Sequence, residues 1–286
     1  MTGVPTATSP PAPRRLLRSA QGRWITTVAA VVLGLLILAA VLAPLVAPVD
    51  PNDTDLSNSL AGPSAEHLLG TDGSGRDIFS RLLYGGRTSL GGPALIVLLT
   101  TLVGVPLGLI AGYYGGLVDS VLGRGWDLML AFPALLLAIV IIATFGRGFV
   151  PAVVAITITS IPFLARVVRG LVLIERPKEY VAACQIQGFG TGRILYRHIL
   201  PNISGPVIAQ VTLNFGYALI DLAALSFIGL GVRPPTPDWG AMLTDGKATI
   251  LSTANPVIWP SIAIIIAVLC VNLLGQAISD RMQRSR

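Results

Sequence analysis

The stretch ERPKEYVAACQIQGFGTGRILYRHILPN, from Glu175 to Asn202, is a polar connection of mixed charge between long apolar segments. A connection that only joined two helices could be much shorter. Pro177 is typical of a first helical position and Glu179 of a first turn, whereas Gly188 and Gly190 would end a helix. The stretch therefore predicts a short helix that lies outside the apolar segments.

A second short helix is predicted in the same stretch, because Thr191 can cap it and Pro201 can close it. The centre of the first helix consists of small residues, Ala182, Ala183 and Cys184, which would let another protein surface approach closely. The alternative is a solvated loop with some helix, and the local pattern leaves both interpretations open.

The composition is that of a membrane protein. Of the 286 residues, 53% are hydrophobic and only 12% are charged, whereas an ordinary soluble domain is about 25% charged. The net charge of +6 is therefore attributed to membrane topology and not to nucleic-acid binding. The two cysteines, Cys184 and Cys270, lie in a polar loop and in an apolar run, so we expect no disulfide.

Six apolar runs are long enough to cross a bilayer, which takes about 20 residues. They cover residues 24–46, 90–112, 126–145, 149–170, 205–231 and 256–278. A cleaved signal peptide is the alternative for the first run, but its apolar core would be only about 7–15 residues long. The sequence predicts an all-α integral membrane protein with six transmembrane helices and both termini on one side.

The basic residues predict which side that is. Fourteen of the 20 Lys and Arg residues fall in the termini and loops that this topology places on the side of the Glu175–Asn202 stretch. Cytoplasmic segments carry such an excess, so we expect both termini and this stretch to face the cytoplasm. The tail of residues 1–23 and the end of residues 280–286 are then cytoplasmic.

The first external connection, residues 47–85, begins with an acidic segment and ends in an amphipathic one. Apolar pairs four residues apart from Arg76 to Tyr84 predict a helix that lies along the outer interface. Asp72, Ser74 and Asp77 stand in a Gly-rich turn, but their spacing does not fit a calcium loop.

Within the apolar runs, polar and small residues stand out. Asp221 is ionisable in the middle of an apolar run, so it should face protein or water and not lipid. It either lines a path across the membrane or forms a hydrogen bond between helices, and Asn214 is a second polar candidate on the same run. The stripe Gly104, Gly108, Gly112 and Gly116 permits close packing, either against another subunit or path or within the chain.

Motifs for catalysis are missing from the sequence. No G-x-x-x-x-G-K-[ST], H-E-x-x-H or C-x-x-C segment occurs. His67 and His198 fall on opposite sides of the predicted membrane and so cannot share a metal ion. We expect no catalytic residues, no cofactor and no metal, and any energy source must lie in another chain.

Several segments resemble a known family. Ala183, Gly188 and Leu200-Pro201 are similar to the cytoplasmic loop shared by permease subunits of bacterial ABC importers, although Ala182, Cys184 and His198 depart from its usual residues. Further similar segments follow in one order over about residues 66–280. They are His67–Asp72, Gly112–Gly116, Ala165–Gly170, Leu225–Gly231, Pro234–Gly240 and Asn272–Gly275. The chain resembles the second permease of dipeptide and oligopeptide importers.

The resemblance implies a type I permease fold with its five-helix domain at residues 86–279 and a coupling loop at 175–202. It implies a sister permease, two ATPase subunits, an external substrate-binding protein and surrounding lipid, in the bacterial plasma membrane. The residues that would couple to the ATPases are Glu179, Tyr180, Ala183, Cys184, Gly188, Arg193, Leu200 and Pro201. The candidate contacts to the binding protein are Pro235, Asp238 and Trp239, although a rigid lid over the helix ends is the alternative.

The cargo that the resemblance implies is a peptide, with nickel, haem or another small solute as alternatives. An ion-coupled secondary transporter is a different class, which would show paired intramembrane charges and repeats with broken helices. A membrane-embedded enzyme would need a catalytic motif. The sequence shows one clear intramembrane carboxylate, Asp221, and favours the permease over both.

Overall fold

The computed structural model describes the backbone of residues 14–284 and the side chains of residues 24–281. The predicted ends, residues 1–23 and 280–286, therefore lie partly outside the described residues. The helices are α1 (Arg14–Val41), α2 (Ala43–Val46), α3 (Ile78–Tyr114), α4 (Gly116–Leu130), α5 (Ala134–Phe145), α6 (Phe149–Glu175), α7 (Glu179–Ile186), α8 (Thr191–Ile194), α9 (Leu200–Phe227), α10 (Trp239–Lys247) and α11 (Asn255–Arg284).

Within the described residues, five helices are long and apolar enough to cross a membrane, and α4 with α5 makes a sixth if the bent pair counts as one span. The two helices meet at 88° around Pro133. The residue before a proline is disfavoured in the helical region, so the chain breaks here. The prediction of six spans is confirmed in this form, but the single helix over residues 126–145 is wrong.

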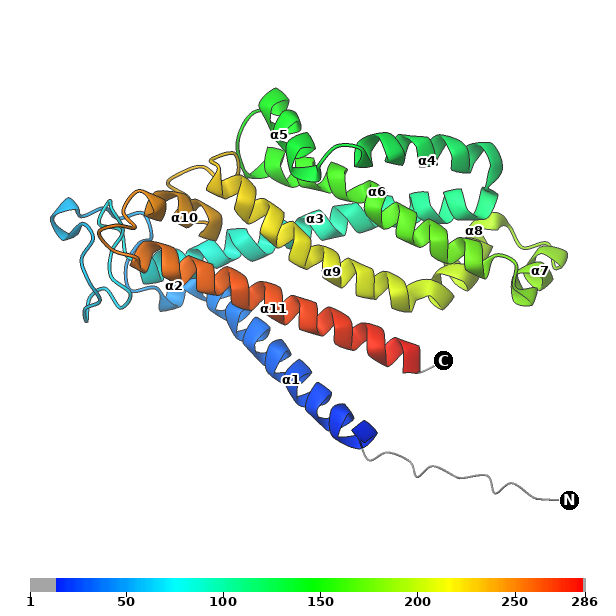
Figure 1. Ribbon diagram of the computed structural model, residues 1–286, viewed down its shortest axis with the longest axis horizontal. Helices are drawn as coiled ribbons and strands as arrows, with labels where there is room; N and C mark the ends of the chain where they lie inside the picture. Colours follow the sequence, from blue (N-terminus) through cyan, green and yellow to red (C-terminus); the bar gives the residue numbers. More distant parts are fainter. Residues whose placement is uncertain (1–13, 285–286) are drawn as a thin grey trace, which may run out of the picture.

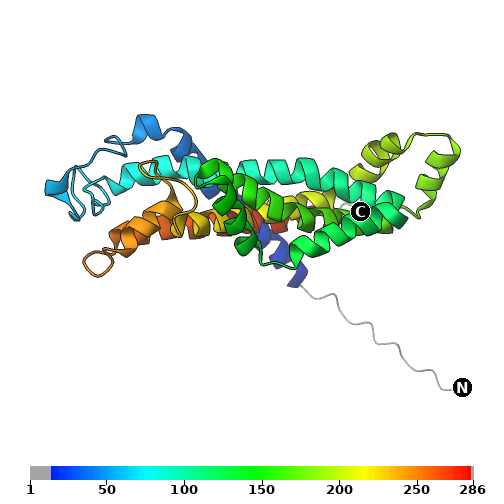
Figure 2. The ribbon, with the colours of Figure 1, turned by 90° about the horizontal axis from the view of Figure 1, so that it is seen from above.

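The bundle is elongated, with α7 at one end and, at the other, α10 and the connection that leads into α3, which the sequence predicted to be external (Figures 1 and 2). The long helices α3, α6 and α9 run between these ends, and α1 packs against α11 and α3. The two ends are therefore the places where this bundle can meet soluble partners.

The glycine stripe packs inside the chain. A Cβ atom at Gly108 would lie 2.5 Å from the carbonyl oxygen of Ala165, and one at Gly112 would lie 2.7 Å from Val172 Cβ. Glycine at these positions lets α3 approach α6 closely, and α3 packs most extensively against α6. Of the two interpretations of the stripe, packing within the chain is the one that the structure supports.

Two predicted helix boundaries are wrong. The expected interfacial helix at Arg76–Tyr84 is the first part of α3, which continues from Ile78 through Pro93 and Pro106. The boundary between residues 85 and 86 thus falls inside a helix. Similarly, Pro201 does not close a helix, since a π-helical turn at Leu195–Ile199 leads directly into α9. Such a turn can accommodate the missing N–H and the ring of a proline.

Candidate functional site

The predicted short helix of the polar connection exists and is α7. It begins at Glu179, two residues after Pro177, and Gly188 follows its end with φ +76°. The amide of Phe189 donates to the carbonyl of Cys184 at 3.1 Å, and that of Gly188 donates to Gln185 at 3.0 Å. These two bonds form a Schellman motif, which explains why a glycine is needed there.

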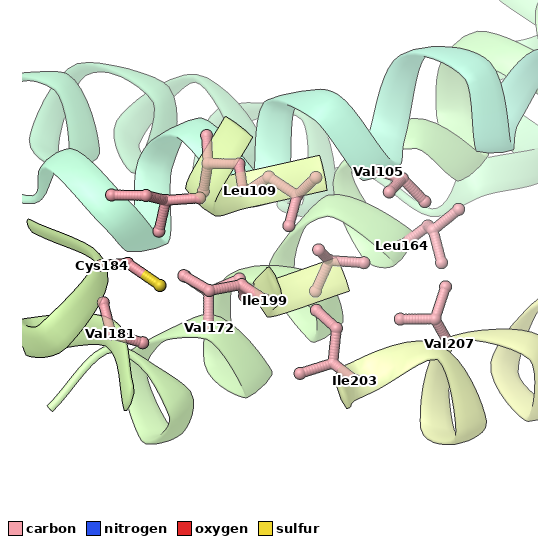
Figure 3. Packing of buried hydrophobic residues seen from close by; sticks show 12 residues of the cluster. Val105, Leu109, Leu164, Val172, Val181, Cys184, Ile199, Ile203 and Val207 are labelled. Atoms are coloured by element: carbon pink, nitrogen blue, oxygen red, sulfur yellow. The ribbon is translucent and has the colours of Figure 1, made fainter. Parts of the chain in front are cut away.

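One face of α7 is buried in the bundle. Val181 is fully buried and Cys184 nearly so, in a cluster with Leu109 of α3, Val172 of α6 and Ile199 (Figure 3). The sequence predicted Cys184 in the surface that another protein approaches, and this is wrong because its side chain points to the spans. The helix is thus seated on three membrane-spanning segments by apolar contacts.

Polar contacts fix the start of α7. The buried carboxylate of Glu175 accepts hydrogen bonds from Lys178 Nζ at 2.7 Å and from Tyr180 OH at 3.0 Å. Burial raises the pKa of Tyr180 above its usual value, so the phenol stays protonated as a donor. Gln185 Nε2 also donates to Tyr113 OH at the end of α3. Tyr180 was predicted to face an ATPase, but its hydroxyl group points to Glu175 at the end of α6.

The opposite face of α7 is open. Glu179, Ala182, Ala183 and Gly188 are exposed, and the side chain of Ile186 is 87% exposed. The sequence analysis missed Ile186, although an aliphatic residue three positions after Ala183 in a polar connection was a usable signal. Small residues beside one exposed aliphatic side chain make a surface that a complementary cleft can cover.

The remaining predicted coupling residues lie after α7, in α8 and at the start of α9. Arg193 is exposed, and its guanidinium carbon lies 4.4 Å from the centre of the Phe189 ring. Leu200 is half-buried against the same apolar cluster as Val181, whereas Pro201 is exposed. The structure therefore places Arg193 and Pro201 on the surface near α7 and uses Leu200 for packing.

Paired charges join α4 to α6, and the sequence analysis missed both pairs. Arg169 donates from Nε and Nη2 to the two oxygens of Asp119, and Arg166 donates from Nη2 to Asp127 Oδ1. The sequence predicted a helix over residues 126–145, but the structure has a helix from Gly116, and Asp119 lies in the part that was not predicted. Two ion pairs thus join the first half of the bent pair α4–α5 to α6.

Comparison with known proteins identifies the family of the chain. Residues 104–286 match the family described as binding-protein-dependent transport system inner membrane component, and residues 24–63 match the N-terminal TM domain of oligopeptide transport permease C. The chain belongs to this permease family. The family confirms the expected class, namely a multi-pass inner-membrane subunit of an ABC transporter.

Related sequences and a related structure agree with this assignment. The permease is 42% identical to the dipeptide transport system permease protein DppC of Alkalihalophilus pseudofirmus, over 94% of this chain and 88% of that protein. It is 40% identical to the glutathione transport system permease protein GsiD of Pectobacterium atrosepticum, over 94% and 88%. It shares the fold of a chain of the MetNI methionine ABC transporter, with TM-score 0.55, 17% identity, and 72% and 95% coverage.

The two polar residues expected along the path lie on α9 of the permease. Asn214 is buried and its Oδ1 accepts a hydrogen bond from Gln210 Nε2 at 2.9 Å. Asp221, two turns later, is partly exposed and has no hydrogen bond or ion pair with the described residues. The predicted hydrogen bond from Asp221 to another helix is therefore absent among the described residues. The Asp221 carboxylate is free to contact a molecule that packs against α9.

Two of the three expected binding-protein contacts are buried. Asp238 accepts from Ser89 Oγ at 2.7 Å and from the amide of Ala241 at 3.1 Å, and burial raises its pKa. Trp239 is 2% exposed and its Nε1 donates to the carbonyl of Leu82, so it does not lie in an interfacial belt. Only Pro235 of the three is exposed. Asp238 and Trp239 hold α10 against α3.

Buried ion pairs hold the external connection in place. Arg76 donates to Asp72 Oδ2 at 2.7 Å and to Asp245 Oδ2 of α10 at 2.8 Å. Arg81, which is 2% exposed, lies within 3.8 Å of both carboxylates and donates to the carbonyl of Pro51. Asp72 is thus engaged by arginines, which agrees with the unsuitable spacing for calcium.

Proposed function

We propose that this chain is a permease subunit of an ATP-driven peptide importer, and that α7 docks on an ATPase subunit at the cytoplasmic face. The observation that carries the proposal is the division of α7 into two faces. Its buried face is locked to α3, α6 and the start of α9, whereas its open face presents Ala182, Ala183 and Ile186. A partner that grips the open face can therefore move three membrane helices.

The partners follow from this architecture. The single chain contains one such helix, and we propose that a sister permease supplies the second half of the path and a second docking helix. ATP binding would close the paired ATPases, and the two helices would follow and switch the path from inward-facing to outward-facing. An external binding protein would deliver the cargo, with the exposed segment Arg233–Thr236 as its nearest candidate contact.

The proposed cargo is a peptide. The relatives that cover most of the chain are named for the transport of dipeptides, of di- and tripeptides, and of glutathione. These names do not favour nickel or haem as cargo. Uptake of a radiolabelled dipeptide by vesicles that contain the full transporter should depend on ATP and on the binding protein. Saturating uptake of Ni²⁺ instead of the dipeptide would contradict the assignment.

The docking step is tested by Ala183→Trp. An indole would overfill the contact between α7 and its cleft without touching a membrane span, since the side chain of Ala183 is exposed. We expect the variant to insert and to bind the sister permease, but to lose the ATPase subunits or the stimulation of ATP hydrolysis by loaded binding protein. Ala65→Trp, an exposed alanine at the other end of the molecule, is the matched control.

A second variant tests the end of the same helix. Gly188→Val forces a side chain into positive φ, which costs about 1 kcal/mol or more. No atom lies within 4 Å of the added Cβ, so the effect comes from the backbone alone. If Ala183→Trp and Gly188→Val both kept the ATPases bound and stimulated, the docking role of α7 would be wrong.

The proposed orientation has its own test. Single cysteines at Ser59 and Thr236 should react with an impermeant thiol reagent outside sealed cells, since both residues are exposed at the outer end. A cysteine at Gln187 should react only after the membrane is opened, with Cys184 and Cys270 replaced first. Labelling of the Gln187 site in sealed cells would reverse the orientation.

A further inference from the structure

Charged side chains of α4 and α6 are left uncovered by the described residues. Arg166 is nine residues before the end of α6, which places it roughly 13 Å from the end of this helix. Its side chain is 46% exposed, and that of its partner Asp127 is 69% exposed. Exposed charges avoid the hydrocarbon of a bilayer, so water or protein should cover this face of the permease.

The two ion pairs between α4 and α6 differ in how many of their donors and acceptors are used. Both oxygens of Asp119 accept from Arg169, and the side chains are 18% and 33% exposed. Asp127 uses only Oδ1 and Arg166 uses only Nη2, so Asp127 Oδ2 and the other donors of Arg166 make no hydrogen bond to the described residues. The first pair is a closed brace, whereas the second pair is open to a ligand.

A hollow of about 470 Å³ lies beside these pairs. It is lined by Ser120, Arg124 and Trp126 together with the four paired residues. Arg124 is exposed and has no hydrogen bond or ion pair with the part of the chain that the structure describes. With three arginines and two aspartates, the lining carries one excess positive charge, and this charge is unpaired.

We propose that this hollow is a binding site for the charged ends of a zwitterionic peptide on its way through the permease. The carboxylate of the peptide would bind Arg124 and the free donors of Arg166, and its ammonium group would bind Asp127 Oδ2. The Asp119–Arg169 pair lies on the wall of the hollow, but both oxygens of Asp119 are already engaged by Arg169, so this pair holds α4 to α6. This inference rests on the proposed import of peptides and adds where the permease itself contacts them.

The chemistry of the site fits such a ligand. The excess positive charge attracts a carboxylate, and the carboxylate and guanidinium of the open pair lie side by side, as the opposite charges of a short peptide require. An arginine can bind a carboxylate with two parallel hydrogen bonds. Because the site is largely exposed, these bonds stay weak enough for release, which a transport path needs.

The test uses a reporter that leaves every charge in place. Ser120→Cys lines the hollow and is exposed, and it is introduced with Cys184→Ser and Cys270→Ser in the full transporter. In inside-out vesicles, a small uncharged maleimide should label it. Millimolar alanyl-alanine should slow this labelling, whereas N-acetyl-alanyl-alanine amide, which has no charged end, should not.

Variants of the charged residues then test which of them bind the peptide. Arg166→Gln, Asp127→Asn and Arg124→Gln should each raise the alanyl-alanine concentration for half protection about tenfold, the value of one charged hydrogen bond. Asp119→Asn, in the closed brace, should keep the protection of Ser120→Cys and is the matched control. ATP hydrolysis stimulated by loaded binding protein should match that of the parent Ser120→Cys transporter in all of them, since the open face of α7 is the same.

Several outcomes would overturn the site while leaving the proposed function intact. One is a Ser120→Cys transporter that takes up dipeptide but is never labelled, because the hollow would then be covered by the sister permease. Another is equal protection by the free and the blocked peptide. A third is unchanged protection and uptake in the Arg166→Gln and Asp127→Asn variants. Loss of ATP-dependent uptake in the unmodified transporter would instead contradict the proposed function.

Discussion

The two ends of the permease are fastened in different ways. At the end that carries α10, the proposed outer end, Arg76 and Arg81 bind Asp72 and Asp245, and Asp238 binds Ser89, so charged and polar groups hold α10 and the connection before α3 to α3. At the end that carries α7, the proposed inner end, α7 is seated mainly by Val181 and Cys184 in an apolar cluster, together with polar contacts from Tyr180 to Glu175 and from Gln185 to Tyr113.

This difference has a mechanical consequence. Buried polar contacts are directional, and each costs free energy when one partner moves away, so they favour a single arrangement. Apolar contacts are non-directional and tolerate small shifts while still keeping surfaces together. The outer end therefore acts as a fixed cap, whereas the inner end is a joint that can transmit a displacement of α7 to the spans.

Removing the central arginine of the cap should give the largest effect. Arg81→Ala would leave Asp245 with one arginine fewer, the carbonyl of Pro51 without its donor, and a cavity around a side chain that is 2% exposed. We expect a loss of about 3 kcal/mol in the free energy of unfolding. The measurement is chemical or thermal unfolding of the purified complex in detergent.

The control for this prediction is a second arginine at the same end. Arg233 is exposed and makes no hydrogen bond or ion pair with the described residues, so Arg233→Ala should change the free energy of unfolding by no more than about 0.5 kcal/mol. Similar losses in both variants would show that the cap is not held by its buried ion pairs.

At the inner end, the expected effect is smaller and concerns coupling. Val181→Ala removes two methyl groups from a fully buried side chain and should cost about 2 kcal/mol of local stability. Because the open face of α7 is unchanged, the ATPases should still bind, but stimulation by loaded binding protein should fall. Hydrogen exchange of α7 and the rate of ATP hydrolysis measure the two effects.

A matched variant on the same helix should behave in the opposite way. Ile186→Ala trims a side chain that is 87% exposed, so hydrogen exchange of α7 should stay unchanged in the isolated permease. Binding of the ATPases should weaken instead. If Val181→Ala and Ile186→Ala gave the same pattern, the division of α7 into a seat and a docking face would be wrong.

The inner end was more predictable from sequence than the outer end, and the reason is local chemistry. The short helix and its end at Gly188 follow from turn and capping residues within one stretch. The predicted facing of Cys184 was wrong, because which side of so short a helix is buried depends on packing against other helices, namely against Val172 and Ile199 and against Leu109, which is far away in the chain.

The outer end depends on contacts that sequence patterns do not contain. Arg76 and Asp245 are 169 residues apart, and Asp238 and Ser89 are 149 apart. A polar residue in a proline-rich loop looks exposed, and only the fold buries it. The pairs between α4 and α6 were missed for the same reason, since Arg166 and Asp127 are 39 residues apart and Arg169 and Asp119 are 50 apart.

The smallest predicted effect is a pH dependence at the cap. Burial raises the pKa of Asp238, so the folded state binds a proton there more tightly than the unfolded chain does. At high pH the ionised carboxylate is buried in the folded state, which lowers the free energy of unfolding. As the pH falls through the raised pKa, the carboxylate is protonated in the folded state and this penalty disappears. The free energy of unfolding therefore rises as the pH falls. Asp238→Asn removes this titration and keeps an oxygen that can accept from Ser89.

The difference in unfolding temperature between the unmodified complex and the Asp238→Asn complex isolates this group, because all other titrations are shared. As the pH is lowered from neutral, the unmodified complex should gain stability relative to the variant. A relative gain toward high pH would instead mean that the bonds from Ser89 and Ala241 outweigh burial, and that the Asp238 carboxylate holds the cap in its ionised form.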